Sequence, residues 1–412
     1  MTGLQTELYA YTIDPETLQE KLRRPERLAA WLDQALRTTE PGNPAEARMH
    51  HTQIGVAARL LRRLDVAEEH LRAALRLAER YGPTPSEVLA RARFAQALQG
   101  QGRFGEALRE FERCLEEGRL LPELGNHYIF VFHQAGRAYY ESGKWDRARE
   151  LLATALRLQL ESEPDEEAVE SARVALDASD ACATAADVGR ELYRLVPEVH
   201  DHAAERLNEL FDRNGLQAHG DFLLPLRTLL LAGPVHTDLA RAVHREYDGD
   251  VDAALAQLAA HDWLQLRGNH LVASERTREV LTALLDIIDD TARGLWGQPV
   301  ELLESLDEVV CRGTGTSSGR VYDPWVAAAP NSGIAGRFFD RLCALQAHRA
   351  DARATARLGE GVTIDQMRAL PLGDPVRIRA AAATDRIAAR LFRPLDVEVR
   401  VRLTDALHAL PA

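Results

Sequence analysis

Three stretches of the chain repeat one pattern: "GVAARLLRRLDVAEEHLRAAL" (residues 55–75), "AQALQGQGRFGEALREFERCL" (95–115) and "GRAYYESGKWDRARELLATAL" (136–156). Small residues occupy the first, thirteenth and twentieth positions of each stretch, and a large apolar residue occupies the seventeenth. Two antiparallel helices approach closely only where small residues face each other, and a large residue fills the space beside that contact. The spacing of 40 and 41 residues between copies therefore predicts three stacked helix pairs.

This pattern resembles the tetratricopeptide repeat, in a variant with a longer linker between repeats, over roughly residues 44–160. The resemblance implies a curved helical solenoid that binds a protein or peptide partner on a concave face lined by the first helix of each repeat. The groove positions that it implies are Arg59, Gln96, Gln99, Phe130, His133, Arg137 and Tyr140. The alternative is that these side chains are merely solvated, beside the expected core residues Tyr128, Phe132 and Tyr139.

The pattern changes after residue 200. Helices are expected over "GDFLLPLRTLLLAG", "VHTDLARAVHREY" and "DVDAALAQLAAHDWL", followed by a two-stranded hairpin that turns at Gly268 and Asn269. Residues from about 200 to 295 resemble the winged helix of the multiple-antibiotic-resistance regulator family. The fold class is therefore expected to be mainly α, a solenoid followed by a winged-helix-like domain with a small β-hairpin wing and a helical tail.

The C-terminal part is similar to the tail of an uncharacterised, largely actinobacterial family that typically reads HRADAH. His348, Arg349 and Asp351 match this motif, while Arg353 and Arg357 stand where that family usually has histidine and tryptophan. The resemblance implies a fold and little function.

The organisation expected from these patterns has five parts. They are an N-terminal helical cap (1–43), three tetratricopeptide repeats (44–160), a degenerate repeat or junction (161–200), the winged-helix-like domain (201–295) and the helical tail (296–412). The apolar face of the helix that begins after Ser274 predicts packing either against the tail or in a homodimer.

Composition argues against several classes of protein without excluding nucleic-acid binding. The net charge of −13 argues against a protein that coats nucleic acid, because phosphate neutralisation dominates such binding. No apolar run approaches the ~18 residues of a spanning helix, and the N-terminus lacks the regions of a signal peptide, so a cytoplasmic protein without membrane contact is expected. The four cysteines form no CxxC pair, which predicts reduced thiols, no metal and no cofactor.

Two segments carry candidate chemistry. Arg312, Gly313, Thr314, Ser317 and Arg320 form a glycine- and hydroxyl-rich loop that suits an anion, although a simple connection is the favoured interpretation. His348, Arg349 and Asp351 are the candidate catalytic residues. Asp351 would orient His348 as a base, whereas the favoured alternative is a structural polar cluster.

These observations favour a cytoplasmic interaction or regulatory protein, with a peptide-binding solenoid and a winged-helix half that dimerises or responds to a ligand. One alternative is a DNA-binding regulator that contacts phosphates through Arg241 and Arg245, although the third helix of the domain is acidic. The other is an enzyme of specialised metabolism with a pocket near His348 and Asp351.

Overall fold

The computed structural model describes residues 9–80, 84–162, 166–217, 219–245, 249–313, 321–328 and 333–411, and the side chains of 311–313 lie outside this description. The chain divides into two compact units, Met1–Asp180 and Ala181–Ala412. Helices dominate both units, which confirms the mainly α class. Among the described residues, no helix combines the length and apolar character needed to cross a membrane.

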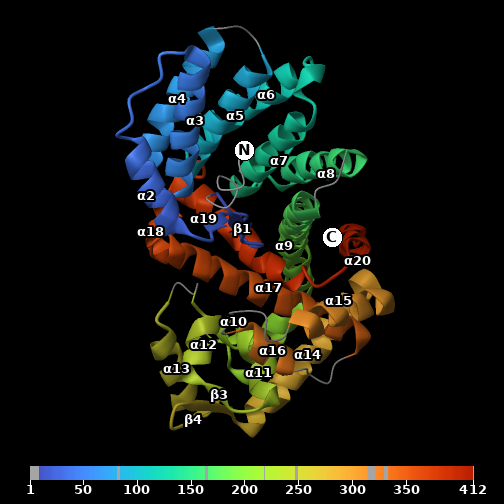
Figure 1. The fold of residues 1–412 in the computed structure, drawn as a ribbon. Coiled ribbons are helices and arrows are strands. Elements are labelled where there is room, and N and C mark those ends of the chain that lie inside the picture. The colour runs from blue at the N-terminus through green and yellow to red at the C-terminus, as the bar shows by residue number, and fades with distance from the viewer. Residues whose placement is uncertain are drawn as a thin grey trace. The chain divides into compact units, whose positions relative to one another are not determined.

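The first unit is built from three helix pairs (Figure 1). They are α3 (Pro44–Leu60) with α4 (Leu64–Arg80), α5 (Pro85–Gly100) with α6 (Phe104–Gly118), and α7 (Asn126–Glu141) with α8 (Trp145–Glu161). Each pair packs internally, α4 packs on α5, and α6 packs on α7. The first helices of successive pairs also touch, α3 with α5 and α5 with α7. The sequence repeat therefore corresponds to a stack of helix pairs.

The recurring small residues create the close contact within each pair. A Cβ atom added to Gly136 would lie 2.6 Å from Cγ of Leu152, and one added to Gly55 would meet Leu71 in the same way. The first helices of the second and third pairs end before Gly102 and Gly143, each with φ of 76°. In the first pair the equivalent position is Arg62, which adopts φ of 61° without being glycine.

The described part of residues 1–43 differs from the expected helical cap. It holds two antiparallel strands, β1 (Tyr11–Ile13) and β2 (Glu20–Leu22), before a single helix, α2 (Pro25–Ala35). Asp14 explains the turn, because its Oδ1 atom accepts hydrogen bonds from the backbone N–H groups of Glu16 (3.0 Å) and Thr17 (2.8 Å). Such side-chain bonds to the backbone compete with helix formation.

Residues 166–200 lie in one continuous helix, α9 (Glu166–Asn214), rather than in a fourth helix pair. Thr184 stands where Gly102 and Gly143 end the first helices of their repeats, and it is buried within α9. Without a glycine at the turn position, the chain continues as helix past the site of the expected turn.

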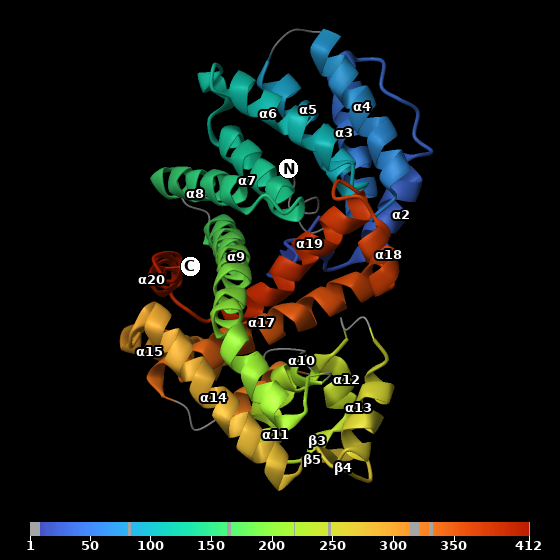
Figure 2. The ribbon, with the colours of Figure 1, turned by 180° about the vertical axis from the view of Figure 1, so that it is seen from behind.

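The second unit gathers around α17 (Ile334–Gly359). This helix packs against α14 (Glu275–Trp296), α15 (Val300–Gly313), α16 (Tyr322–Ala327) and α19 (Pro375–Ala388), and Figure 2 shows α17 and α19 from behind. The apolar face of α14 is thus covered within the chain, which agrees with packing on the tail. Shorter elements complete the C-terminal end of the unit: α18 (Ile364–Ala369), the 3₁₀ turn η3 (Ala389–Leu391) and α20 (Val397–His408).

A small three-stranded sheet lies at the start of this unit, in the order β3-β5-β4. β4 (Leu264–Arg267) and β5 (His270–Ala273) pair antiparallel, with Leu264 opposite Ala273, and Gly268 adopts φ of 61° in the turn between them. The short helices before this pair are α10 (Gly220–Leu223), η2 (Leu224–Leu226), α11 (Arg227–Ala232), α12 (Thr237–Val243) and α13 (Val251–Ala260), with β3 (Val235–His236) between α11 and α12.

Candidate functional site

Polar residues of the first helices meet the turn of the β1–β2 hairpin of the same unit. Arg59 donates two hydrogen bonds to the carboxylate of Glu20, at 2.6 and 3.3 Å, and Arg137 donates a third to this carboxylate at 3.1 Å. Arg137 also donates to the carbonyl of Leu18, and the hydroxyl of Tyr140 donates to the carbonyl of Glu16. The groove positions expected to bind a peptide therefore contact residues 16–20 of the chain itself.

The electrostatics of this contact hold the carboxylate ionised. Burial alone would raise the pKa of Glu20, but the guanidinium groups of Arg59 and Arg137 outweigh it and lower the pKa to about 2. The side chain of Leu18 is fully buried beside them. Gln96 and Gln99 are also buried, and Gln96 donates to Gln134 at 2.7 Å. The three glutamines and Glu20 line a small cavity of about 50 Å³.

Phe130 and His133 face a different and larger space. They line a cavity of about 1030 Å³ between β1, α7, α8 and the start of α9, together with Tyr9 and Tyr11. Burial lowers the pKa of His133 to about 3, and Arg137 adds to the effect, so its imidazole is neutral. The structure thus separates the predicted groove residues into a polar set that contacts the hairpin and an aromatic set beside it.

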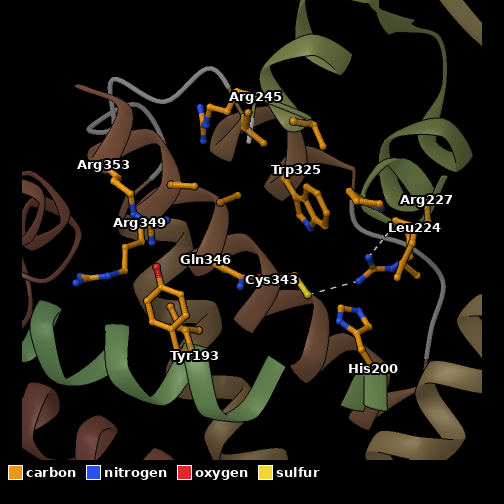
Figure 3. A pocket seen from close by; sticks show the side chains of 16 residues that line it. Tyr193, His200, Leu224, Arg227, Arg245, Trp325, Cys343, Gln346, Arg349 and Arg353 are labelled. Atoms are coloured by element: carbon orange, nitrogen blue, oxygen red, sulfur yellow. Dashed lines mark hydrogen bonds between the residues drawn. The ribbon is translucent and has the colours of Figure 1, made fainter. Parts of the chain in front are cut away.

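The second unit contains a cavity of about 280 Å³ between α9, α16 and α17 (Figure 3). Trp325, Cys343 and Arg227 lie on one side of it, and Arg349 and Arg353 lie toward the other. A second cavity of about 440 Å³ continues toward α18 and α19 and shares Tyr193, Arg245, Arg349 and Arg353 with the first. Of the three candidate catalytic residues, only Arg349 lines these cavities.

One side of the cavity contains the buried guanidinium of Arg227. Arg227 is 2% exposed and donates to the carbonyl of Leu224 at 2.9 Å and to Asp340 at 3.3 Å. Its Nη2 atom also lies 3.5 Å from Sγ of Cys343. Burial raises the pKa of Cys343 to about 11, although Arg227 opposes the effect, so the group is a thiol and not a nucleophilic thiolate.

The expected base dyad does not form. Both carboxylate oxygens of Asp351 are occupied, because they accept hydrogen bonds from Arg245 and from the backbone N–H groups of Val321 and Tyr322. His348 is buried and bonds through Nε2 to the carbonyl of Ala388 at 3.3 Å, while its Nδ1 atom has no partner among the described residues. Burial lowers the pKa of His348 to about 4. The geometry is that of a structural polar cluster.

The arginines expected to meet phosphates in the DNA-binding alternative are both paired with aspartates. Arg241 contacts Asp238 at 2.8 Å and Asp252 at 2.9 Å, and Arg245 contacts Asp351. Asp250, at the start of α13, caps this helix by accepting from the N–H groups of residues 252 and 253. The acidic residues therefore stabilise α13 locally and neutralise the neighbouring cations.

The predicted anion loop lies largely outside the described residues. Thr314, Ser317 and Arg320 are not described, and of Arg312 and Gly313 only the backbone is, at the end of α15. In the described part of the chain, no group of three or more histidine, cysteine or acidic side chains is placed to hold a metal ion.

The helix pairs define an α-helical repeat protein. Comparison of the sequence with protein-family models shows which repeat it resembles. Residues 45–116, which include the first two helix pairs, match the family model described as "Tetratricopeptide repeat". This match confirms the repeat predicted from the sequence and indicates protein–protein interaction in general. No curated protein and no solved structure matches the chain.

Sequence reasoning missed two features of these sites. The first is Glu20 with its hairpin, for which the only sequence signal is an acidic residue in an N-terminal segment too short to form its own core. The second is the arginine-lined cavity. The sequence signal for this cavity was the pair Arg353 and Arg357, which stand where the HRADAH-type tail usually has histidine and tryptophan. Both residues line the second cavity.

Proposed function

We propose that this chain is a cytoplasmic interaction and regulatory protein whose tetratricopeptide groove binds a peptide or protein partner. The second unit would serve as a winged-helix-like body that dimerises or responds to a ligand. The match to tetratricopeptide repeats supports the interaction function.

One observation carries the proposal: side chains of the first helices already bind the turn of the β1–β2 hairpin and Glu20, the first residue of β2. Arg59 and Arg137 hold a carboxylate, and Arg137 and Tyr140 donate to backbone carbonyls, so side-chain and main-chain features of the bound segment are both read. Guanidinium groups pair with carboxylates in a fixed, forked geometry that favours such recognition. The partner would therefore present an acidic side chain beside exposed backbone carbonyls, in place of residues 16–20.

The order of elements supports the winged-helix-like assignment of the second unit. Three short helices, α11, α12 and α13, precede the antiparallel strands β4 and β5. The strand β3, which lies between α11 and α12 in the sequence, pairs with β5 as the third strand of the sheet. The pairing of Arg241 and Arg245 with aspartates disfavours phosphate contacts, so a role in dimerisation or ligand response is proposed rather than DNA binding.

A peptide added in solution tests the groove. The tethered segment has a high effective concentration, so the wild-type protein should exclude a competing peptide. The double variant Leu18→Ala with Glu20→Gln weakens the internal segment and should bind a fluorescent peptide with the sequence of residues 14–23, as measured by fluorescence anisotropy. Adding Arg137→Gln to this variant should reduce the affinity at least tenfold.

The matched control is Arg113→Gln, which removes an exposed guanidinium of α6 that pairs with Glu117 rather than with the hairpin. It should leave peptide binding unchanged in the weakened background. Absence of peptide binding to the weakened variant, or equal binding to the wild type, would contradict the proposed groove.

A further inference from the structure

We propose that the cavity of the second unit binds a small organic anion, with its phosphate or carboxylate groups beside Arg349 and Arg353 and its apolar body against Trp325. This rests on the ligand-responsive role proposed above for this unit and specifies the chemistry of the ligand. The site lies within residues 181–412 and is independent of the peptide groove.

The charge of the cavity walls selects an anion. Among the described residues, seven arginines line the two cavities, against one lining carboxylate, that of Asp385. Three of them pair with aspartates: Arg349 with Asp385, Arg245 with Asp351 and Arg227 with Asp340. Guanidinium groups stay charged in proteins, so an anion that enters this space meets several positive charges. This excess of cations contrasts with the net charge of −13 of the whole chain.

Two of the arginines shared by the cavities are held in fixed positions, which favours an anion of matching geometry. The guanidinium of Arg353 lies 5.5 Å from the ring centroid of Tyr193, a cation–π contact that orients the group. Burial lowers the pKa of Arg353, which indicates that its charge is poorly solvated there. Arg349 is fixed by a further hydrogen bond to the carbonyl of Ala185 at 3.0 Å. Two positioned guanidinium forks are suited to a phosphate or carboxylate.

The opposite side of the first cavity presents the aromatic ring of Trp325. Trp325 is 7% exposed and lines the cavity, yet its Nε1–H group has no hydrogen-bond acceptor among the described residues. Leu192, Leu224 and Val243 also line this cavity. A buried donor without an acceptor is unfavourable, so the indole favours a ligand with an acceptor near its apolar body. Cavities of about 280 and 440 Å³ suit a small molecule.

The fluorescent probe 8-anilinonaphthalene-1-sulfonate joins an aromatic body to an anionic group, so it matches this chemistry. The full chain should bind it saturably, and the neutral analogue N-phenyl-1-naphthylamine should bind at least tenfold more weakly. Arg353→Gln and Arg357→Gln, made separately, should each weaken the sulfonate probe at least fivefold. Arg402→Gln, which changes an exposed arginine of α20 outside the cavity, is the matched control and should bind as the wild type does.

Competition identifies the anionic group. Displacement of the probe by pyrophosphate assigns a phosphate ligand, and displacement by citrate assigns a polycarboxylate. Displacement by neither, equal binding of the neutral analogue, or unchanged binding in both cavity variants overturns the proposal. Because the peptide of residues 14–23 is measured by a separate anisotropy signal, loss of one kind of binding is distinguishable from loss of the other.

Discussion

Single small residues set the distance between the helices of each repeat. At Gly136 an added methyl group has no room, because its position is 2.6 Å from Leu152 Cγ and 3.3 Å from the backbone nitrogen of that residue. The helix pair must separate or Leu152 must move, and both options lose packing. We expect Gly136→Ala to lower the free energy of unfolding by about 1–3 kcal/mol, measured by urea denaturation.

Gly105 provides the matched control, because it lies in a helix of the second repeat but is exposed. The nearest atom to a Cβ added there is Nη1 of Arg109 at 3.9 Å. Gly105→Ala should therefore stabilise the protein by up to about 1 kcal/mol through helix propensity. A loss of stability of the same size at both positions would mean that the close approach at Gly136 is not the cause.

At the scale of elements, the hairpin β1–β2 is held by a buried ion network rather than by a core of its own. Removing one partner leaves a buried charge unpaired, so Glu20 and Arg137 should be strongly coupled. We expect a double-mutant cycle of Glu20→Gln and Arg137→Gln to give a coupling free energy of about 1–3 kcal/mol by denaturant unfolding. The exposed pair Arg157 and Glu161 on α8 is the control, with an expected coupling below about 0.5 kcal/mol.

The hairpin also shows which part of the site was predictable from sequence. The resemblance to the tetratricopeptide repeat predicted Arg59 and Arg137 as groove positions. It did not predict that residues 16–20 lie against them, because that contact joins positions 117 and 119 residues apart and depends on tertiary packing. The polar cluster shows the same limit: helical spacing allows His348 to meet Asp351, but Asp351 binds Arg245, 106 residues earlier in the chain.

At the scale of the whole molecule, the helical repeats could be predicted and the cavity of the second unit could not. The repeat occurs three times in the sequence, so several positions recur together and the pattern is unlike a chance match. The cavity collects side chains from α9, α16, α17, α18 and α19, which have no common spacing along the chain. Its arginines therefore form a group only after folding.

Acid should destabilise the second unit more than the first. Burial lowers the pKa of His200, His244 and His348 to about 4 in the second unit. In the first unit, burial lowers the pKa of His133 to about 3 and also lowers the pKa of His70. Each histidine is neutral when folded, so the unfolded chain takes up protons first as the pH falls below 6.5. The stability present above that pH is then lost progressively down to the folded pKa, by about 2 kcal/mol per histidine at pH 5.

Hydrogen exchange measured by mass spectrometry between pH 7.5 and 5.0, corrected for intrinsic exchange rates, would follow each unit separately. The opening free energy of the second unit should fall by several kcal/mol, and that of the first unit should fall by less. His348→Gln should reduce the fall in the second unit by about 2 kcal/mol, because the variant has no group there to protonate. His261→Gln, at an exposed position of the same unit, should leave the fall unchanged. An equal fall in both units, or no difference between the two variants, would show that the buried histidines do not govern acid stability.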